Sequence, residues 1–132
     1  MAGVRAEARA QARVNAFDRV RRIGLTLTGV EWSTRYDGSP RLTLDGCFVA
    51  GLATHESAEA DTLVVRMDQD QRTLLLEDAP DTYYVTDYYA RYPLVLARLR
   101  AMTDDALRDL LATSRRLTVP KTRQARTRRG TR

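Results

Sequence analysis

The sequence has very few of the side chains that build metal sites and disulfide bonds. Its 132 residues include one cysteine, Cys47, and one histidine, His55. A single cysteine cannot form an internal disulfide, and these two residues cannot supply the thiolate and imidazole clusters that bind zinc or iron. The glycine-rich loops that cradle phosphates in nucleotide-binding proteins are also missing. We therefore predict that the protein has no metal site and no cofactor.

Candidate catalytic residues are equally scarce. His55 lies in an acidic stretch, and Cys47 follows a hairpin glycine with no histidine near it in the sequence. Asp104 and Asp105 stand where a helix is expected to begin, and there they complement the helix dipole. We predict no catalytic residues and no enzymatic activity.

Long hydrophobic runs are absent as well. No apolar stretch approaches the ~18 residues that span a bilayer, and the N-terminus lacks the continuous apolar segment of a secretory signal. We therefore predict a cytoplasmic protein that does not bind membranes. Its length suffices for one domain, which we assign to residues 14–119. Before it we expect an Ala/Arg-rich helical extension at 1–13, and after it a basic, disordered tail at 120–132.

Basic residues are concentrated at the two ends of the chain. Residues 118–132 carry six basic side chains and no acidic one, and residues 1–22 carry six against two. Residues 23–117 carry ten basic side chains against fifteen acidic ones, so the body of the protein is acidic although the net charge is +5. All basic residues except Lys121 are arginine, which makes bidentate contacts with phosphate and bases. A genome-wide preference for arginine codons accounts for the same bias.

Apolar periodicity predicts an α+β fold. Helical spacing leads from Phe17 to Leu27 and ends at Gly29. Alternating residues and turn signals then predict an antiparallel sheet of five to six strands, because tight turns such as Asp45-Gly46 join consecutive strands into hairpins. The predicted strands cover residues 32–36, 41–44, 47–52, 63–67, 83–86 and 94–99.

Two more helices complete the predicted pattern. Asp68 and Gln71 have the spacing of a capping box, which opens a short central helix. Thr103 is a suitable cap for a C-terminal helix, which we expect to end at Pro120 because proline lacks a backbone N–H group.

A series of short motifs follows the same order along residues 19–121. The motifs are Leu25 to Glu31, the turn Tyr36, Gly38, Pro40, the hairpin Gly46, Phe48, Ala50, and then Leu63 to Leu76, Tyr84 to Thr86, Tyr92 to Leu96, Asp105 to Leu111 and Pro120-Lys121. In this order they resemble the MmcQ/YjbR-like family of small α+β proteins. The resemblance implies a double-wing arrangement of sheet and helices and a DNA-binding function. The chain has Cys47, Tyr88 and Arg115 where the family commonly has a lysine, a histidine and an aromatic residue.

From the resemblance and the charge distribution, we predict that double-stranded DNA is the partner. Contacts with backbone phosphates, which carry no sequence information, predict low sequence specificity. A solvated terminus with no partner accounts for the basic tail equally well. The predicted contacts are Arg115, Arg116, Lys121, Arg123, Arg126, Arg128 and Arg129, with Arg35 and Arg41 assisting from a wing.

Five of the six tyrosines lie between residues 83 and 92. Since neighbouring residues of a strand face opposite sides of a sheet, we expect two or three of the five in the core and two at least partly exposed. Tyr88, Tyr89 and Tyr92, with Arg91, are the candidates for a surface on which bases stack. The same surface suits the alternative function, a non-enzymatic protein- or small-ligand-binding module in which the tail has no role.

Overall fold

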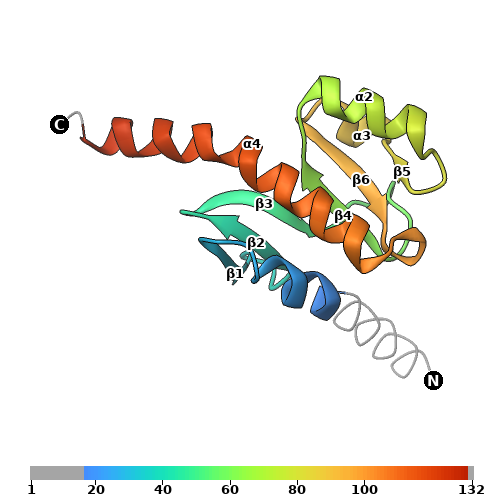
Figure 1. Ribbon diagram of the computed structural model, residues 1–132, viewed down its shortest axis with the longest axis horizontal. Helices are drawn as coiled ribbons and strands as arrows, with labels where there is room; N and C mark the ends of the chain where they lie inside the picture. The colour runs from blue at the N-terminus through green and yellow to red at the C-terminus, as the bar shows by residue number, and fades with distance from the viewer. Residues whose placement is uncertain (1–16, 131–132) are drawn as a thin grey trace.

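The computed structural model of the protein describes residues 17–130, with side chains as far as residue 122. The predicted helical extension at residues 1–13 lies outside the described part. Within that part, a six-stranded antiparallel sheet is combined with helices (Figure 1), which confirms the predicted α+β class.

The sheet follows the predicted hairpins closely. The turn between its second and third strands has positive φ angles at both Asp45 (49°) and Gly46 (80°), as the tightest hairpin turns require. The first strand ends two residues before Tyr36, which is 99% exposed in the next turn. From edge to edge, the strands are β1 (Val30–Thr34), β2 (Pro40–Leu44), β3 (Cys47–Leu52), β4 (Thr62–Arg66), β6 (Leu94–Arg98) and β5 (Tyr83–Tyr84).

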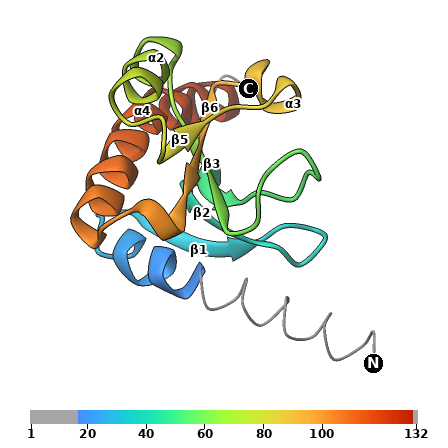
Figure 2. The same ribbon diagram turned by 90° about the vertical axis from the view of Figure 1, so that its right-hand side faces the viewer.

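The helices are divided between the two sides of the sheet. Figure 2 shows α2, α4 and the N-terminal helix on one side, and α3 with the β1–β2 and β3–β4 connections on the other. The helices are an N-terminal helix described over residues 17–24, α2 (Gln69–Asp78), α3 (Asp87–Ala90), the short 3-10 helix η1 (Leu99–Ala101) and α4 (Asp104–Gly130). Asp68 caps α2, since its side chain accepts a hydrogen bond of 2.8 Å from the backbone N–H of Gln71, as the capping-box pattern predicts.

The main core lies between the sheet and the longer helices. Strands β4 and β6 turn Leu63 and Val95 toward it, and α4 contributes Leu107 and Leu111, all with no exposed surface. Ser114 of α4 is also buried and donates a hydrogen bond of 2.9 Å to the carbonyl oxygen of Val49, so the helix is fixed to β3 by a polar contact within an apolar layer.

The predicted end of the last helix at Pro120 is wrong. Helix α4 continues through Pro120 to Gly130, so residues 120–130 are helical. A proline inside a helix removes one backbone hydrogen bond and costs about 3 kcal/mol. Packing opposes this cost, because Thr118 and Thr122 are both buried on either side of the proline. The Thr118 hydroxyl also donates to the carbonyl oxygen of Ser114 (2.7 Å).

The opposite face of the sheet carries a smaller cluster built around Val64, Tyr89 and Leu96. The tyrosines divide as expected. Tyr83 joins the main core and Tyr89 the smaller cluster, whereas Tyr88 and Tyr92 are 38% and 43% exposed. The strand predicted at 83–86 contains only Tyr83 and Tyr84.

Candidate functional site

A hollow of about 390 Å³ lies on the face of the sheet opposite α4. It brings together two sets of residues that were predicted separately, the wing arginines Arg35 and Arg41 and the tyrosines Tyr88, Tyr89 and Tyr92. Its described lining contains no carboxylate, so the only charged side chains that line it are cationic. The lining consists of Arg35, Arg41, Phe48, Leu52, Thr54, Val64, Tyr88, Tyr89, Tyr92 and Leu94.

The tyrosines form one aromatic group with His55. The His55 ring stacks on Tyr88, with ring centroids 3.6 Å apart and an angle of 6° between the planes. Tyr89 meets Tyr88 edge-on at 4.9 Å, and Tyr92 lies 6.0 Å from Tyr88 at 56°. Edge-on pairs at about 5 Å are favourable, and the His55 ring lies face to face with Tyr88, so the four rings pack as one group.

Arginine side chains surround this aromatic group. The guanidinium carbon of Arg91 lies 5.7 Å from the centre of the Tyr88 ring and 5.9 Å from that of Tyr92. Arg41 donates from Nε to Ser33 Oγ (3.1 Å), which orients its guanidinium group. Within the described residues, Arg35, Arg41 and Arg91 make no ion pair, so their charge is available to an anion.

The turn between β1 and β2, residues 35–39, holds the backbone of Arg35 in place. Its backbone N–H donates to the carbonyl oxygen of Ser39 (2.8 Å), and its own carbonyl oxygen accepts from Gly38 (2.9 Å). Hydrogen bonds from the hydroxyl and backbone N–H of Ser39 hold the pKa of Asp37 below its ordinary value, and Arg35 contributes less. Asp37 therefore stays charged beside Arg35 and offsets part of the positive charge of the turn.

Many other arginines are engaged in holding the fold together. Arg66 donates to the carbonyl oxygen of Phe48 (2.7 Å), and burial lowers the pKa of this arginine. Arg19 donates to the carbonyl oxygen of Leu99 (3.0 Å) and pairs with Asp104 (2.6 Å). Among the residues whose side chains are described, the arginines therefore divide into those that bind carboxylates or carbonyl oxygens of the fold and those, such as Arg35, Arg41 and Arg91, that make no ion pair.

Arg72 supports the hollow from α2, which lies on the side of the sheet that α4 covers (Figure 2). Its Nη1 atom lies within hydrogen-bonding distance of the carbonyl oxygens of Ala90 (3.2 Å), Tyr92 (3.1 Å) and Leu94 (3.2 Å). These carbonyls belong to the segment that joins α3 to β6. Arg72 thus fixes the backbone that carries Tyr92 without lining the hollow itself.

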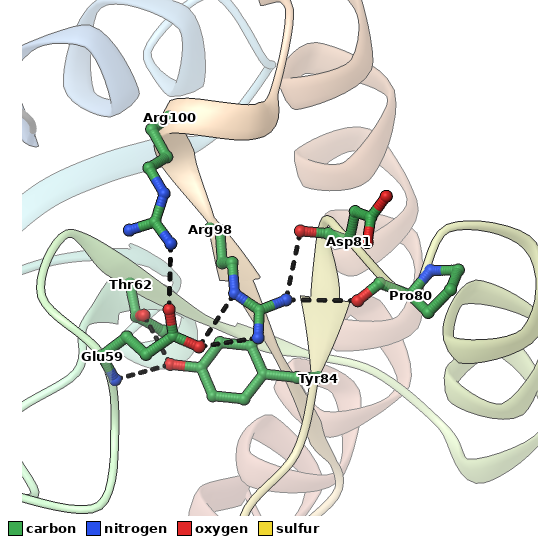
Figure 3. Close-up of polar contacts among 7 residues, drawn as sticks. All are labelled: Glu59, Thr62, Pro80, Asp81, Tyr84, Arg98 and Arg100. Atoms are coloured by element: carbon green, nitrogen blue, oxygen red, sulfur yellow. Dashed lines mark hydrogen bonds and ion pairs between the residues drawn. The ribbon is translucent and has the colours of Figure 1, made fainter.

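Arg98 fixes the β3–β4 connection through Glu59 (Figure 3). The same connection carries His55. Its Nε and Nη2 atoms donate to Glu59 Oε2 (2.9 and 2.6 Å), and Nη1 donates to the carbonyl oxygens of Pro80 (3.2 Å) and Asp81 (3.1 Å). The hydrogen bonds between Arg98 and Glu59 hold the pKa of the Glu59 carboxyl below its ordinary value and raise the pKa of Arg98. The pair therefore stays charged and ties the loop to β6.

Further hydrogen bonds join this loop to the tyrosine segment. The backbone N–H of Glu59 donates to the Tyr84 hydroxyl (2.8 Å), and that of His55 donates to the Tyr89 hydroxyl (3.1 Å). The Ser57 hydroxyl lies 2.9 Å from that of Thr86. The ring of His55 is thus held against Tyr88 by its own backbone as well as by stacking.

The predicted contacts on α4 lie apart from the hollow, because this helix covers the other face of the sheet. Arg115 donates from Nε to the carbonyl oxygen of Thr28 (2.6 Å), which joins α4 to the segment before β1. Arg116 and Lys121 are exposed. The side chains of Arg123, Arg126, Arg128 and Arg129 lie outside the described residues.

Sequence reasoning missed several residues in and around the hollow. It gives Phe48 only a place in a hairpin motif and Thr54 no role, although both line the hollow. It weighs His55 only as a metal ligand or a catalytic base, and it gives no role to Arg72. One signal for His55 was its place in a loop between two strands of a sheet that also carries the tyrosines. Nothing in the sequence indicates that Arg72 reaches three carbonyl oxygens about twenty residues away.

Comparisons with models of protein families, with curated proteins and with solved structures gave no match to this chain. No helix in the described part is both long enough and apolar enough to cross a membrane. Among the residues whose side chains are described, no group of three or more His, Cys, Asp and Glu residues is placed to hold a metal ion. The chemistry offered by the hollow is therefore that of aromatic rings and arginines.

Proposed function

We propose that this protein is a non-enzymatic, cytoplasmic protein that binds DNA with low sequence specificity. The DNA-binding part of the proposal is what the resemblance to the MmcQ/YjbR-like family implies. The grouping of Arg35, Arg41 and Arg91 around the exposed rings of Tyr88 and Tyr92 is the observation that carries the proposal. Guanidinium groups without internal ion pairs attract phosphates. Exposed tyrosine rings add a stacking surface that tolerates any base.

The acidic body of the protein is compatible with this function because none of the described residues that line the hollow is acidic. Glu59 pairs with Arg98 and Arg100, and Asp104 pairs with Arg19. A polyanion that approaches the hollow therefore meets its arginines before it meets these carboxylates.

The test is the salt dependence of duplex-DNA affinity in the full chain. We expect the slope of log affinity against log salt to be roughly −3 to −5. Replacing Arg35, Arg41 and Arg91 together by glutamine should make that slope less negative by about 0.9 for each phosphate contact that is lost. A second variant replaces the tail residues Arg123, Arg126, Arg128 and Arg129 by glutamine and measures their share.

The matched control replaces Arg21, Arg22 and Arg108, three exposed arginines on other elements, and so removes the same charge. Its slope should stay close to that of the parent protein. An equal loss in the control would contradict a role for the hollow. If the parent protein binds no DNA even at low salt, the proposal is wrong, and the alternative of a protein- or small-ligand-binding module remains.

A further inference from the structure

We propose that the hollow accepts one unpaired base, stacked on Tyr92, while the phosphates beside that base bind Arg35 and Arg41. The protein then binds single-stranded nucleic acid in preference to a duplex. This inference rests on the proposed function and specifies which form of nucleic acid the site takes.

The size and chemistry of the hollow suit a flat ring with a charged attachment. Its volume of about 390 Å³ lies near the lower end of the ~300–1,000 Å³ that is typical of small-molecule sites. Phe48, Val64 and Leu94 supply an apolar part of the lining, and Arg35 and Arg41 supply the charge. In a nucleotide the flat base is uncharged and its two faces are apolar, whereas the phosphate is anionic. The apolar part of the lining therefore suits the base, and the two arginines suit the phosphates.

The free ring surface is found mainly on Tyr92. His55 already covers one face of Tyr88, so an incoming ring can stack only on the opposite face of that residue. Tyr92 has no face-to-face ring partner among the described residues, it is 43% exposed, and it lines the hollow. The guanidinium group of Arg91 lies over its ring at 5.9 Å, so a base stacks on the face of Tyr92 away from Arg91. Tyr92 is therefore the first platform for a base, with Tyr88 beside it.

Gly51 gives the arginine side of the hollow its shape. Arg41 on β2 is the register partner of Gly51 on β3. A Cβ atom added at Gly51 would lie 3.3 Å from the Cβ of Arg41 and 3.2 Å from the ring of Phe48. The missing side chain thus lets the stem of Arg41 and the Phe48 ring lie close together, with the guanidinium group beside an apolar surface.

A duplex cannot use this arrangement without distortion. Each base inside a duplex is stacked on both faces and paired at its edge, and extruding it costs a few kcal/mol. An unpaired base has both faces free and incurs little of this cost. Stacking on Tyr92 therefore favours single strands, loops and frayed ends.

The test compares the affinities of the full chain for a short fluorescent oligothymidylate and for a duplex of the same length. Tyr92→Leu should weaken binding of the single strand roughly 5- to 150-fold, which corresponds to the ~1–3 kcal/mol of one stacked base. Duplex affinity should change little. Tyr92→Phe keeps the ring and should bind like the parent protein, and Tyr36→Leu removes a tyrosine that is 99% exposed and does not line the hollow.

Four results would overturn the inference, and only the last of them also overturns the proposed function. If the parent binds nucleic acid but Tyr92→Leu leaves single-strand affinity unchanged, only the base-binding role of the hollow is wrong. The same holds if Tyr92→Leu weakens single strand and duplex equally, or if Tyr36→Leu weakens single-strand binding as much as Tyr92→Leu. If the parent binds neither form, both proposals are wrong. Because Tyr92 is exposed, we expect its variants to fold, and the urea midpoint of each one checks this.

Discussion

The two faces of the sheet are covered by different kinds of structure. Helix α4, α2 and the N-terminal helix bury one face under an aliphatic core, in which Leu63, Val65 and Leu111 have no exposed surface. The other face is covered by α3, only four residues long, and by the β3–β4 connection. There the smaller cluster of Val64, Tyr89 and Leu96 lies beneath the hollow, which Arg35 and Arg41 also line.

From this difference we infer that stability resides mainly in the helix-covered face, and we propose that binding resides in the other. Strand alternation serves both faces at once, since Leu63 and Val65 point to the main core while Val64 between them lines the hollow. Apolar burial holds the helix-covered face. The other face depends more on hydrogen bonds from arginines, chiefly Arg72 and Arg98, whose partners lie in its loops. We therefore expect changes on the two faces to separate stability from binding.

The largest expected effect comes from the helix-covered face. Replacing Leu111 by alanine leaves a cavity under α4 and should lower the free energy of unfolding by about 2 to 5 kcal/mol, measured by urea denaturation. The fraction that stays folded should bind nucleic acid like the parent. Leu96→Ala deletes an equally buried leucine from the opposite face, and it should lower both stability and affinity because Leu96 belongs to the same cluster as Tyr89.

Leu74→Ala is the control for this pair, because Leu74 is 52% exposed on α2 and should change stability by no more than about 0.5 kcal/mol. Equal losses of affinity in the Leu111 and Leu96 variants would contradict a division of roles between the two faces.

A smaller effect on stability, with a larger one on binding, is expected at Arg72. Arg72→Met keeps most of the apolar stem but removes the donor shared by three carbonyl oxygens. The free energy of unfolding should fall by about 1 to 2 kcal/mol, and single-strand affinity should fall because the segment that carries Tyr92 is loosened. Arg108→Met removes an exposed arginine of α4 and should change neither quantity. If Arg72→Met leaves single-strand affinity unchanged, Arg72 does not position the site.

Much of this fold was predictable from the sequence, because its elements are set by local patterns. The hairpin at Asp45-Gly46, the cap at Asp68 and the division of the tyrosines follow from turn chemistry, capping and strand alternation. The error at Pro120 has a tertiary cause. A local rule ends the helix there, but the burial of Thr118 and Thr122 outweighs that rule.

The candidate site was predictable only in pieces. The sequence indicates Arg35, Arg41 and the tyrosines as two separate sets, since nothing local shows that the wing and α3 border the same hollow. That proximity follows from the strand order, in which β6 lies next to β4 and brings the tyrosine segment over the middle of the sheet. The roles of Arg72 and Arg98 depend on contacts across many residues, so no sequence pattern separates them from the unpaired arginines.

The smallest expected effect is a pH dependence that arises at the loop beside the hollow. Hydrogen bonds from Arg98 hold the pKa of Glu59 below its ordinary value of 4.5. A carboxyl group whose pKa is lower in the folded than in the unfolded state contributes stability above its unfolded pKa. This contribution is lost as the pH falls through the folded pKa, because the protonated group no longer pairs with Arg98.

The measurement is the melting temperature of the parent protein and of Glu59→Gln, from about pH 7 down to about pH 3. The parent should be the more stable of the two near neutral pH, and the difference should shrink once the pH falls below about 4.5. Glu56→Gln, in the same loop but without an ion pair among the described residues, is the matched control for charge. Since Glu59 is exposed, screening keeps the effect small, and added salt should reduce it further. A difference that stayed constant over the whole pH range would show that Glu59 acts only through its neutral hydrogen bonds, and that the loop beside the hollow is not held by charge.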